Sequence, residues 1–181
     1  MLTYNGQVHR LEMNIVGMEA VCSRNEKSNY FKVSRLWKEF NSKLSNIKNR
    51  VNRSSWQKFG IYYNSTGTNF NYMACIPVLK FEQTPPGFIE KKIPSLTYLE
   101  FIHTGSIEDI YSSVKVIYRK HLKEMNIQPL DQERIGVNHF EEYGKGFHWK
   151  RHDSELKILI PVGFRSSNPN LSKPELVRSQ R

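Results

Sequence analysis

The sequence predicts an α+β protein built from two βαββ halves, and three observations support that prediction. The tripeptide Ile-Pro-Val closes two apolar segments, at residues 76–78 and 160–162. Before each copy the residue pattern runs in the same order: a strand, an amphipathic helix and two further strands. A proline- and glycine-rich connector at residues 82–87, EQTPPG, separates the two series. Each unit is too small to bury its own apolar face, so we expect the two to pack side by side.

The first half begins with alternating apolar residues at 9–23, where the alternation changes phase once beside Gly17. This pattern predicts a strand with a bulge or kink at the glycine. Apolar residues then recur every three or four positions over 28–47, which indicates an amphipathic helix. Residues 58–64 and 70–79 read as two strands, and the intervening STGT predicts a hairpin turn.

The second half repeats this order. Residues 87–105 contain two strand-like pieces around Pro94, and residues 106–125 carry one apolar stripe of helical spacing. Ser106, followed by an acidic residue three positions later, predicts a capping box at the helix start. Residues 133–143 and 154–162 are predicted as strands.

We therefore expect a single domain, residues 1–164, whose halves span about residues 7–80 and 87–163. The two halves should be related by a pseudo-twofold axis, with both helices over one face of antiparallel sheet and a cleft at the seam. The polar, aperiodic segment 165–181 is expected to be a flexible tail.

Composition limits the class of protein. The chain has 181 residues, 38% of them hydrophobic, which is enough to form a buried core. No apolar run approaches the ~18 residues that span a bilayer, and the N-terminus lacks the pattern of a signal peptide. The two cysteines, Cys22 and Cys75, make no disulfide framework. We expect a soluble, cytoplasmic protein with reduced cysteines and no membrane partner.

The net charge of +10 is unevenly distributed, because residues 24–58 contain ten Lys or Arg against two Glu. A basic surface of this kind attracts polyanions, so nonspecific nucleic acid or an acidic protein is a candidate partner. The alternative is a solvated helix face and loop that keep the protein soluble.

The order and spacing of these segments resemble the GyrI-like effector-binding domain, which is attached to AraC- and MerR-type multidrug-responsive transcription regulators and also occurs alone. The most specific pieces are IPSLTYLEFIHTG at 93–105 and DSELKILIPV at 153–162, similar to the family patterns IPAGKYAVFTHKG and DSEIEIWIPV. The resemblance implies two SH2-like repeats that bind small hydrophobic or aromatic molecules, cationic ones among them, between the halves. The halves occupy the chain up to Gly163, so we expect a stand-alone module without its own DNA-binding helix-turn-helix, for transcription regulation or drug sequestration.

Glu155 is the first candidate binding residue, because the family pattern has an acid at this position. A carboxylate in a half-buried apolar cleft is costly unless paired, so it would have a raised pKa or await a positive ligand. The alternative is a surface glutamate at the start of a strand, paired with Lys157.

Aromatic side chains form the second set of candidates, because planar cations bind the faces of such rings with ~0.5–2 kcal/mol each. The alternative for each ring is packing in the core. Only one of Tyr62 and Tyr63 can face the cleft, and the alternation does not say which. The candidate rings are Tyr62, Tyr72, Tyr98, Phe101, Tyr118 and Trp149.

We expect no metal and no cofactor. His148 and His152 are four residues apart, but no third ligand follows at a spacing that suits zinc. Two other functions stay open. The first is hydrolysis of reactive small molecules, with Glu155 as general base beside a tyrosine hydroxyl. The second is a gyrase-inhibitor-like module that binds a protein partner.

Overall fold

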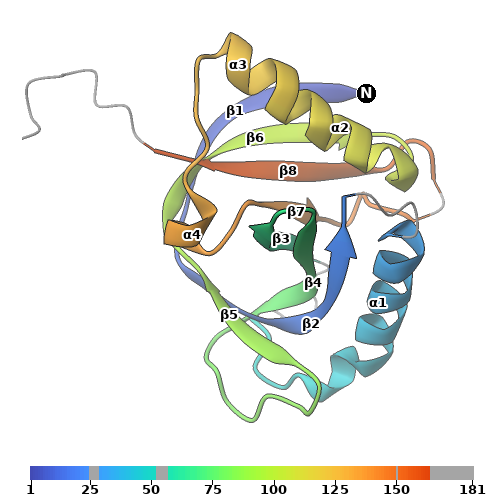
Figure 1. Cartoon of the computed structure of the whole chain (residues 1–181). Coiled ribbons are helices and arrows are strands. Elements are labelled where there is room, and N and C mark those ends of the chain that lie inside the picture. The colour runs from blue at the N-terminus through green and yellow to red at the C-terminus, as the bar shows by residue number, and fades with distance from the viewer. Residues whose placement is uncertain (25–28, 52–56, 150, 164–181) are drawn as a thin grey trace, which may run out of the picture.

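One antiparallel sheet of eight strands forms the body of the protein (Figure 1). The computed structural model describes residues 1–24, 29–51, 57–149 and 151–163. Its strands are β1 (Leu2–Arg10), β2 (Met13–Ser23), β3 (Lys58–Thr66), β4 (Asn69–Val78), β5 (Ile89–Ile93), β6 (Leu96–Thr104), β7 (His139–Tyr143) and β8 (Glu155–Val162). Its helices are α1 (Asn29–Lys43) with η1 (Leu44–Asn46), then η2 (Ile107–Asp109), α2 (Ile110–Val116), the π-helical turn η3 (Ile117–His121), α3 (Leu122–Glu124) and α4 (Gln132–Ile135).

The strand order is symmetrical about the centre of the sheet. The order is β1-β6-β8-β7-β3-β4-β2-β5. Strands β1 to β4 of the first half correspond to β5 to β8 of the second, and each strand lies as far from one edge of the sheet as its counterpart lies from the other. The leading strands cross between the halves, since β1 pairs with β6 and β5 pairs with β2. The predicted α+β class is confirmed, and β3 and β7 join the two halves at the middle of the sheet.

The two Ile-Pro-Val segments occupy matching positions in this arrangement. The Pro77 carbonyl accepts a hydrogen bond from the Val51 amide at 3.2 Å, on the chain that returns from α1. The Pro161 carbonyl accepts one from the Leu130 amide at 2.9 Å, on the chain that returns from α3. In each half, therefore, the last strand ends against the segment that follows the helix.

The sheet carries a hydrophobic core on each face. Residues of α1, α2, η3 and α3 pack against one face, where Trp37, Phe40, Ile117, Leu122 and Ile158 are buried. The other face carries a second cluster, to which the central strands and strands toward both ends of the sheet contribute. Its buried members are Ile15, Phe59, Ile61, Tyr63, Met73, Cys75, Ile93, Tyr98, Val137, Phe140 and Leu159. Because both faces are covered, central strands are apolar at consecutive positions.

This double burial corrects the prediction of a bulge at Gly17. Strand β2 pairs with β4 without a register shift, and its side chains alternate between the two cores. A glycine is required here by close packing against β4, because a Cβ at this position would overlap the carbonyl oxygen of Ala74 and lie 2.8 Å from Cα of Cys75. The apparent phase change is therefore the signature of a strand buried on both faces.

The predicted strand at 133–143 was wrong in its first part. The Asp131 side chain accepts a hydrogen bond from the Glu133 amide at 3.0 Å and caps the short helix α4. Gly136, with φ 72°, ends that helix, so β7 begins only at His139. The Ser106 cap is present, but its hydroxyl accepts from the Glu108 amide at 3.3 Å.

Strand β1 was also missed, since the predicted first half begins at about residue 7. The predicted tail, 165–181, lies outside the described residues. Within the described ranges, no helix combines the length and the apolar character needed to cross a bilayer.

Candidate functional site

A buried carboxylate lies at the centre of the sheet, on the face that the helices cover. Glu141 of β7 is 1% exposed, and three tyrosine hydroxyls donate hydrogen bonds to it. Tyr62 bonds Oε1 at 3.1 Å, while Tyr72 and Tyr143 bond Oε2 at 3.0 and 2.6 Å. Hydrogen bonds of this kind compensate a carboxylate for the water it loses on burial.

Strand register brings these groups together. Strand β3 lies between β7 and β4, with Gly60 opposite Glu141 and Tyr62 opposite Tyr72. A Cβ at position 60 would overlap the Tyr72 hydroxyl and lie 2.7 Å from Oε2 of Glu141. The glycine therefore provides the space that the carboxylate and its phenol partner occupy.

Burial determines the protonation of the cluster. It raises the pKa of Glu141, although the hydrogen bonds from Tyr143, Tyr72 and Tyr62 act in the opposite direction. Burial, reinforced by the nearby Glu141 carboxylate, also raises the pKa of each of these three tyrosines. The phenols thus remain protonated and available as donors.

A buried histidine extends the cluster on the same side of β7. The His139 ring stacks on Tyr62 with 4.1 Å between centroids, and its Nδ1 lies 3.3 Å from the Tyr118 hydroxyl. Burial lowers the pKa of His139 to about 3, so its imidazole is neutral near pH 7. Its Nε2 has no hydrogen-bond partner among the described residues.

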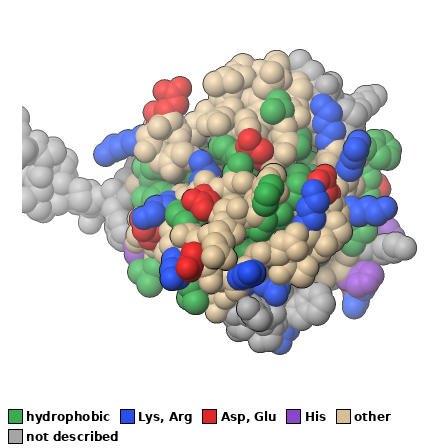
Figure 2. Space-filling view, turned by 90° about the horizontal axis from the view of Figure 1, so that it is seen from below, with side chains coloured by type: hydrophobic (Ala, Val, Ile, Leu, Met, Phe, Trp, Pro, Cys, Tyr) green, Lys and Arg blue, Asp and Glu red, His purple; other side chains and the backbone are tan. Residues whose placement is uncertain are grey.

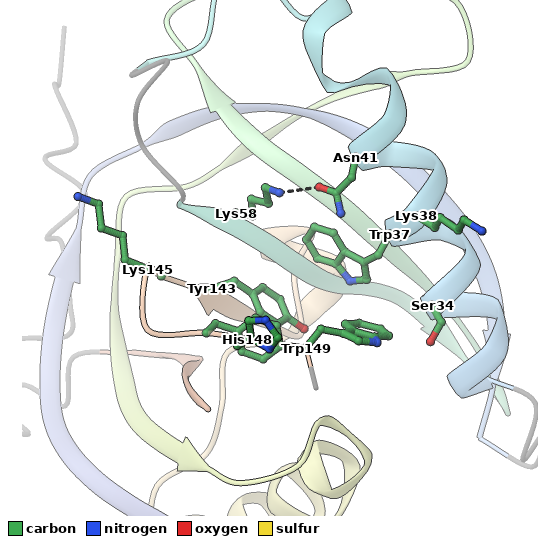
Figure 3. A pocket seen from close by; sticks show the side chains of 11 residues that line it. Ser34, Trp37, Lys38, Asn41, Lys58, Tyr143, Lys145, His148 and Trp149 are labelled. Atoms are coloured by element: carbon green, nitrogen blue, oxygen red, sulfur yellow. Dashed lines mark hydrogen bonds between the residues drawn. The ribbon is translucent and has the colours of Figure 1, made fainter. Parts of the chain in front are cut away.

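A cavity of about 830 Å³ opens beside this cluster, between α1 and the loop that follows β7 (Figure 3). The rings of Trp37 and Tyr143 meet edge to face with 5.1 Å between their centroids, and the rings of Phe147 and Tyr143 do so with 4.7 Å between theirs. Trp149 stacks on Tyr30 of α1 at 6.3 Å. The complete lining is Ser34, Trp37, Lys38, Asn41, Lys58, Tyr143, Gly144, Lys145, Phe147, His148 and Trp149.

Two lining residues connect the cavity to the buried carboxylate. The indole Nε1 of Trp37 donates to the Tyr72 hydroxyl at 3.0 Å, and Tyr143 bonds Glu141 directly. A molecule in the cavity would touch both rings, so the Glu141 carboxylate lies one side chain away from it.

The structure places part of the predicted aromatic set at this site. Tyr62 and Tyr72 contact Glu141, and Trp149 lines the cavity. Tyr62 is the member of its pair that faces the helices, whereas Tyr63 belongs to the core on the opposite face.

The other three predicted rings lie elsewhere. Tyr98 is in the opposite core, where its hydroxyl donates to the Pro94 carbonyl at 3.2 Å. Phe101 is on the helix side but packs against Tyr4 and His121. Tyr118 donates to the carbonyl of Asn138 at 3.2 Å, beside the buried His139 rather than in the cavity lining.

Glu155 is exposed at the start of β8 and does not line the cavity. Strand alternation places it on the same side as Lys157, whose ammonium group bonds Glu100 on the sheet face away from the helices. The carboxylate with the predicted buried environment is instead Glu141, which the sequence analysis did not single out. The available signal was its position between His139 and Tyr143 on one side of a short strand.

The sequence analysis also considered a metal site and a basic surface at residues 24–58. There, no three His, Cys, Asp or Glu side chains lie close enough to hold a metal ion. The basic segment 24–58 falls partly outside the described residues, which omit 25–28 and 52–56. On the face seen in Figure 2, basic and acidic side chains are interspersed.

Comparison with known proteins agrees with this fold. The sequence model of the Cass2 family, described as integron-associated effector binding protein, matches residues 8–162. Transcriptional regulator BrlR of Pseudomonas aeruginosa is 26% identical over 156 residues, which make up 86% of this chain and 54% of the regulator. The chain thus spans about half the length of that curated relative.

Two solved structures share the architecture. SAV2435, solved bound to tetraphenylphosphonium, matches with a TM-score of 0.67 and 12% identity over 88% of this chain and 93% of its own. The integron cassette protein VCH_CASS2, from the mobile metagenome of Vibrio cholerae, matches with a TM-score of 0.59 and 18% identity over 90% of this chain and 99% of its own. At these identities the likeness establishes the fold.

Proposed function

The chain belongs to the Cass2 family of integron-associated effector binding proteins, and from that premise we propose that it binds an aromatic small molecule between α1 and the loop after β7. The observation that carries this proposal is the cavity itself. Its volume of about 830 Å³ lies within the range of sites that hold drug-sized ligands. Four aromatic residues, Trp37, Tyr143, Phe147 and Trp149, supply apolar surface, and polar groups at the edge can orient a ligand.

The position of the cavity supports binding between the two halves. Helix α1 and Lys58 of β3 come from the first half, whereas Tyr143 and the loop to Trp149 come from the second. A ligand would therefore contact both halves and stabilise their packing. By fixing how the two halves pack, the ligand changes the surface that the module presents to a partner.

Relatives support the ligand class and the output. SAV2435 has been solved with tetraphenylphosphonium, a molecule of four phenyl rings around one charged atom. BrlR is a transcriptional regulator, and the chain aligns with about half of it. We infer that the ligand of this chain is an aromatic effector and that its binding serves transcription regulation or drug sensing.

The test is a thermal-shift and tryptophan-fluorescence titration of the protein with tetraphenylphosphonium and with tetraphenylborate. Binding to the native state raises the unfolding midpoint by mass action. Trp149→Ala removes a ring from the cavity edge and should weaken binding of the ligand. Tyr111→Ala removes an exposed ring on α2, outside the lining, and serves as the matched control. If neither ion raises the midpoint, or if both variants lose binding equally, the proposal is wrong.

A further inference from the structure

Three exposed aromatic rings form a continuous surface beside the cavity, and we call them the outer rings. The rings of Tyr30 and Phe31 on α1 meet edge to face with 5.6 Å between their centroids, and Tyr30 stacks on Trp149 with 6.3 Å between theirs. Phe31 is 73% exposed, Tyr30 37% and Trp149 36%. Single exposed apolar side chains are ordinary on a protein surface, whereas a contiguous group of them marks a place where another molecule binds.

Trp149 connects this surface to the cavity. Its side chain is part of the cavity lining, whereas Tyr30 and Phe31 are not. In Figure 3 the Trp149 ring extends toward Ser34 of α1. Because this ring both lines the cavity and is partly exposed, it lies where the cavity meets solvent. A ligand that fills the cavity up to Trp149 therefore ends next to the other two outer rings.

The backbone is fixed immediately before the outer rings on each side. On α1, the Asn29 side-chain amide donates to the Ser23 carbonyl at 2.5 Å, and its oxygen accepts from the Ser23 amide at 3.1 Å. In the loop after β7, the His148 amide donates to the hydroxyl of the buried Ser154 at 3.0 Å, and this hydroxyl donates to the His148 carbonyl at 2.5 Å. Rings held on a fixed backbone lose little conformational freedom when a ligand packs on them.

We propose that the outer rings form a second subsite of the cavity, which binds a second aromatic group of the same ligand. This rests on the proposed function, since it extends the binding site of the same cavity. The ligand class that fits is an elongated molecule, with one ring system inside the cavity and another, on a short flexible linker, packed on Tyr30, Phe31 and Trp149. Continuity through Trp149 favours this occupant over a second copy of the chain, because a ligand in the cavity would already contact one of the three rings.

The experiment compares butyltriphenylphosphonium with (phenylbutyl)triphenylphosphonium, which carry the same triphenyl cation and differ by one terminal phenyl ring. Isothermal titration calorimetry measures both affinities. The added ring should tighten binding about two- to tenfold, the range for one aromatic pair. Phe31→Ala should remove most of this gain and leave the affinity for the butyl compound unchanged, because Phe31 lies outside the cavity lining. Tyr111→Ala removes an exposed ring of α2 and should retain the gain.

The outcomes separate the two proposals. Binding of neither compound overturns the aromatic-binding module itself. Equal affinities for the two compounds, or an equal loss of the gain in Phe31→Ala and Tyr111→Ala, overturn the outer subsite and leave the cavity in place. Sedimentation velocity without ligand tests the other occupant, since a dimer that dissociates in Phe31→Ala would assign the outer rings to a contact between copies and overturn the subsite. If the alanine variant does not fold, Phe31→Leu removes the ring while keeping an apolar side chain.

Discussion

The Tyr143 hydroxyl donates a hydrogen bond to Oε2 of Glu141 at 2.6 Å, from a position two residues further along the same strand. Side chains two apart on a strand point to the same face, so the pair forms without any contribution from a loop. The ring of Tyr143 also lines the cavity. One residue thus joins the surface that a ligand would touch to the buried carboxylate beneath it.

The first prediction concerns the space around this carboxylate. Gly60→Ala should destabilise the protein by about 1–3 kcal/mol, because the added methyl group would overlap Tyr72 and press on Glu141. Urea denaturation followed by circular dichroism measures the change. Gly146→Ala is the control, since nothing lies within 4 Å of the added atom there. Equal stabilities for the two variants would contradict the crowding at position 60.

The second prediction uses the raised pKa of Glu141. In the folded state this group holds its proton to higher pH than in the unfolded chain, whose value is near 4.5. Its contribution to stability is therefore fully present below that value and is lost as pH rises through the folded pKa, by up to about 1.4 kcal/mol per pH unit.

Glu141→Gln replaces the carboxyl group with an amide that does not titrate. The unfolding free energy of the native protein should therefore fall relative to that of the variant as the pH is raised from 4.5. Urea titrations at a series of pH values measure the difference. A difference that grows in the opposite direction would mean that the three phenols hold the carboxylate ionised.

The third prediction concerns His139, whose pKa is lowered to about 3 by burial. His139 takes up a proton near pH 6.5 in the unfolded chain but only near pH 3 in the folded protein. The contribution of His139 to stability is therefore fully present above pH 6.5 and is lost as the pH falls from 6.5 toward 3. The total loss is about 4–5 kcal/mol at most.

His139→Phe retains a ring against Tyr62 and removes the titrating group, so the acid-induced loss should become smaller. Denaturation midpoints between pH 3 and 7 provide the measurement. His152→Gln, a change at an exposed histidine, is the matched control. A slope that survives in His139→Phe would assign the acid sensitivity to other groups.

The overall fold was largely predictable because its signals are local. Helical spacing, a hairpin turn and the two Ile-Pro-Val segments each depend on neighbouring residues, and they predicted the order of elements in the two halves. The resemblance to the GyrI-like domain implied the effector-binding fold, which the family match confirms. Strand β1 was missed because it is an edge strand, and all of its residues are exposed or only half-buried. Its alternating pattern is correspondingly weak.

The site was less predictable because its contacts are distant in sequence. Tyr62 and Glu141 are 79 residues apart, and they meet only because β3 pairs with β7 in one register. Sequence alternation shows that Glu141 and Glu142 face opposite sides, but not which side the helices cover. The Glu155 hypothesis failed to find the buried acid for the same reason, since strand parity places Glu155 on the side of Lys157.

The last prediction applies one substitution at two positions. Glu155→Gln should change the free energy of unfolding by less than about 0.5 kcal/mol, as expected for an exposed side chain away from buried networks. Binding of tetraphenylborate or tetraphenylphosphonium should stay within about twofold of the unmodified protein, because the side chain lies outside the cavity lining.

Glu141→Gln provides the contrast, because its amide nitrogen cannot accept a hydrogen bond from Tyr72 or Tyr143. At pH 7 it should alter stability by about 1–3 kcal/mol in either direction, depending on whether the buried carboxyl group is ionised. It should also change the fluorescence of Trp37, which bonds Tyr72. A tenfold loss of ligand affinity in Glu155→Gln, with unchanged affinity in Glu141→Gln, would show that Glu155 and not Glu141 takes part in binding.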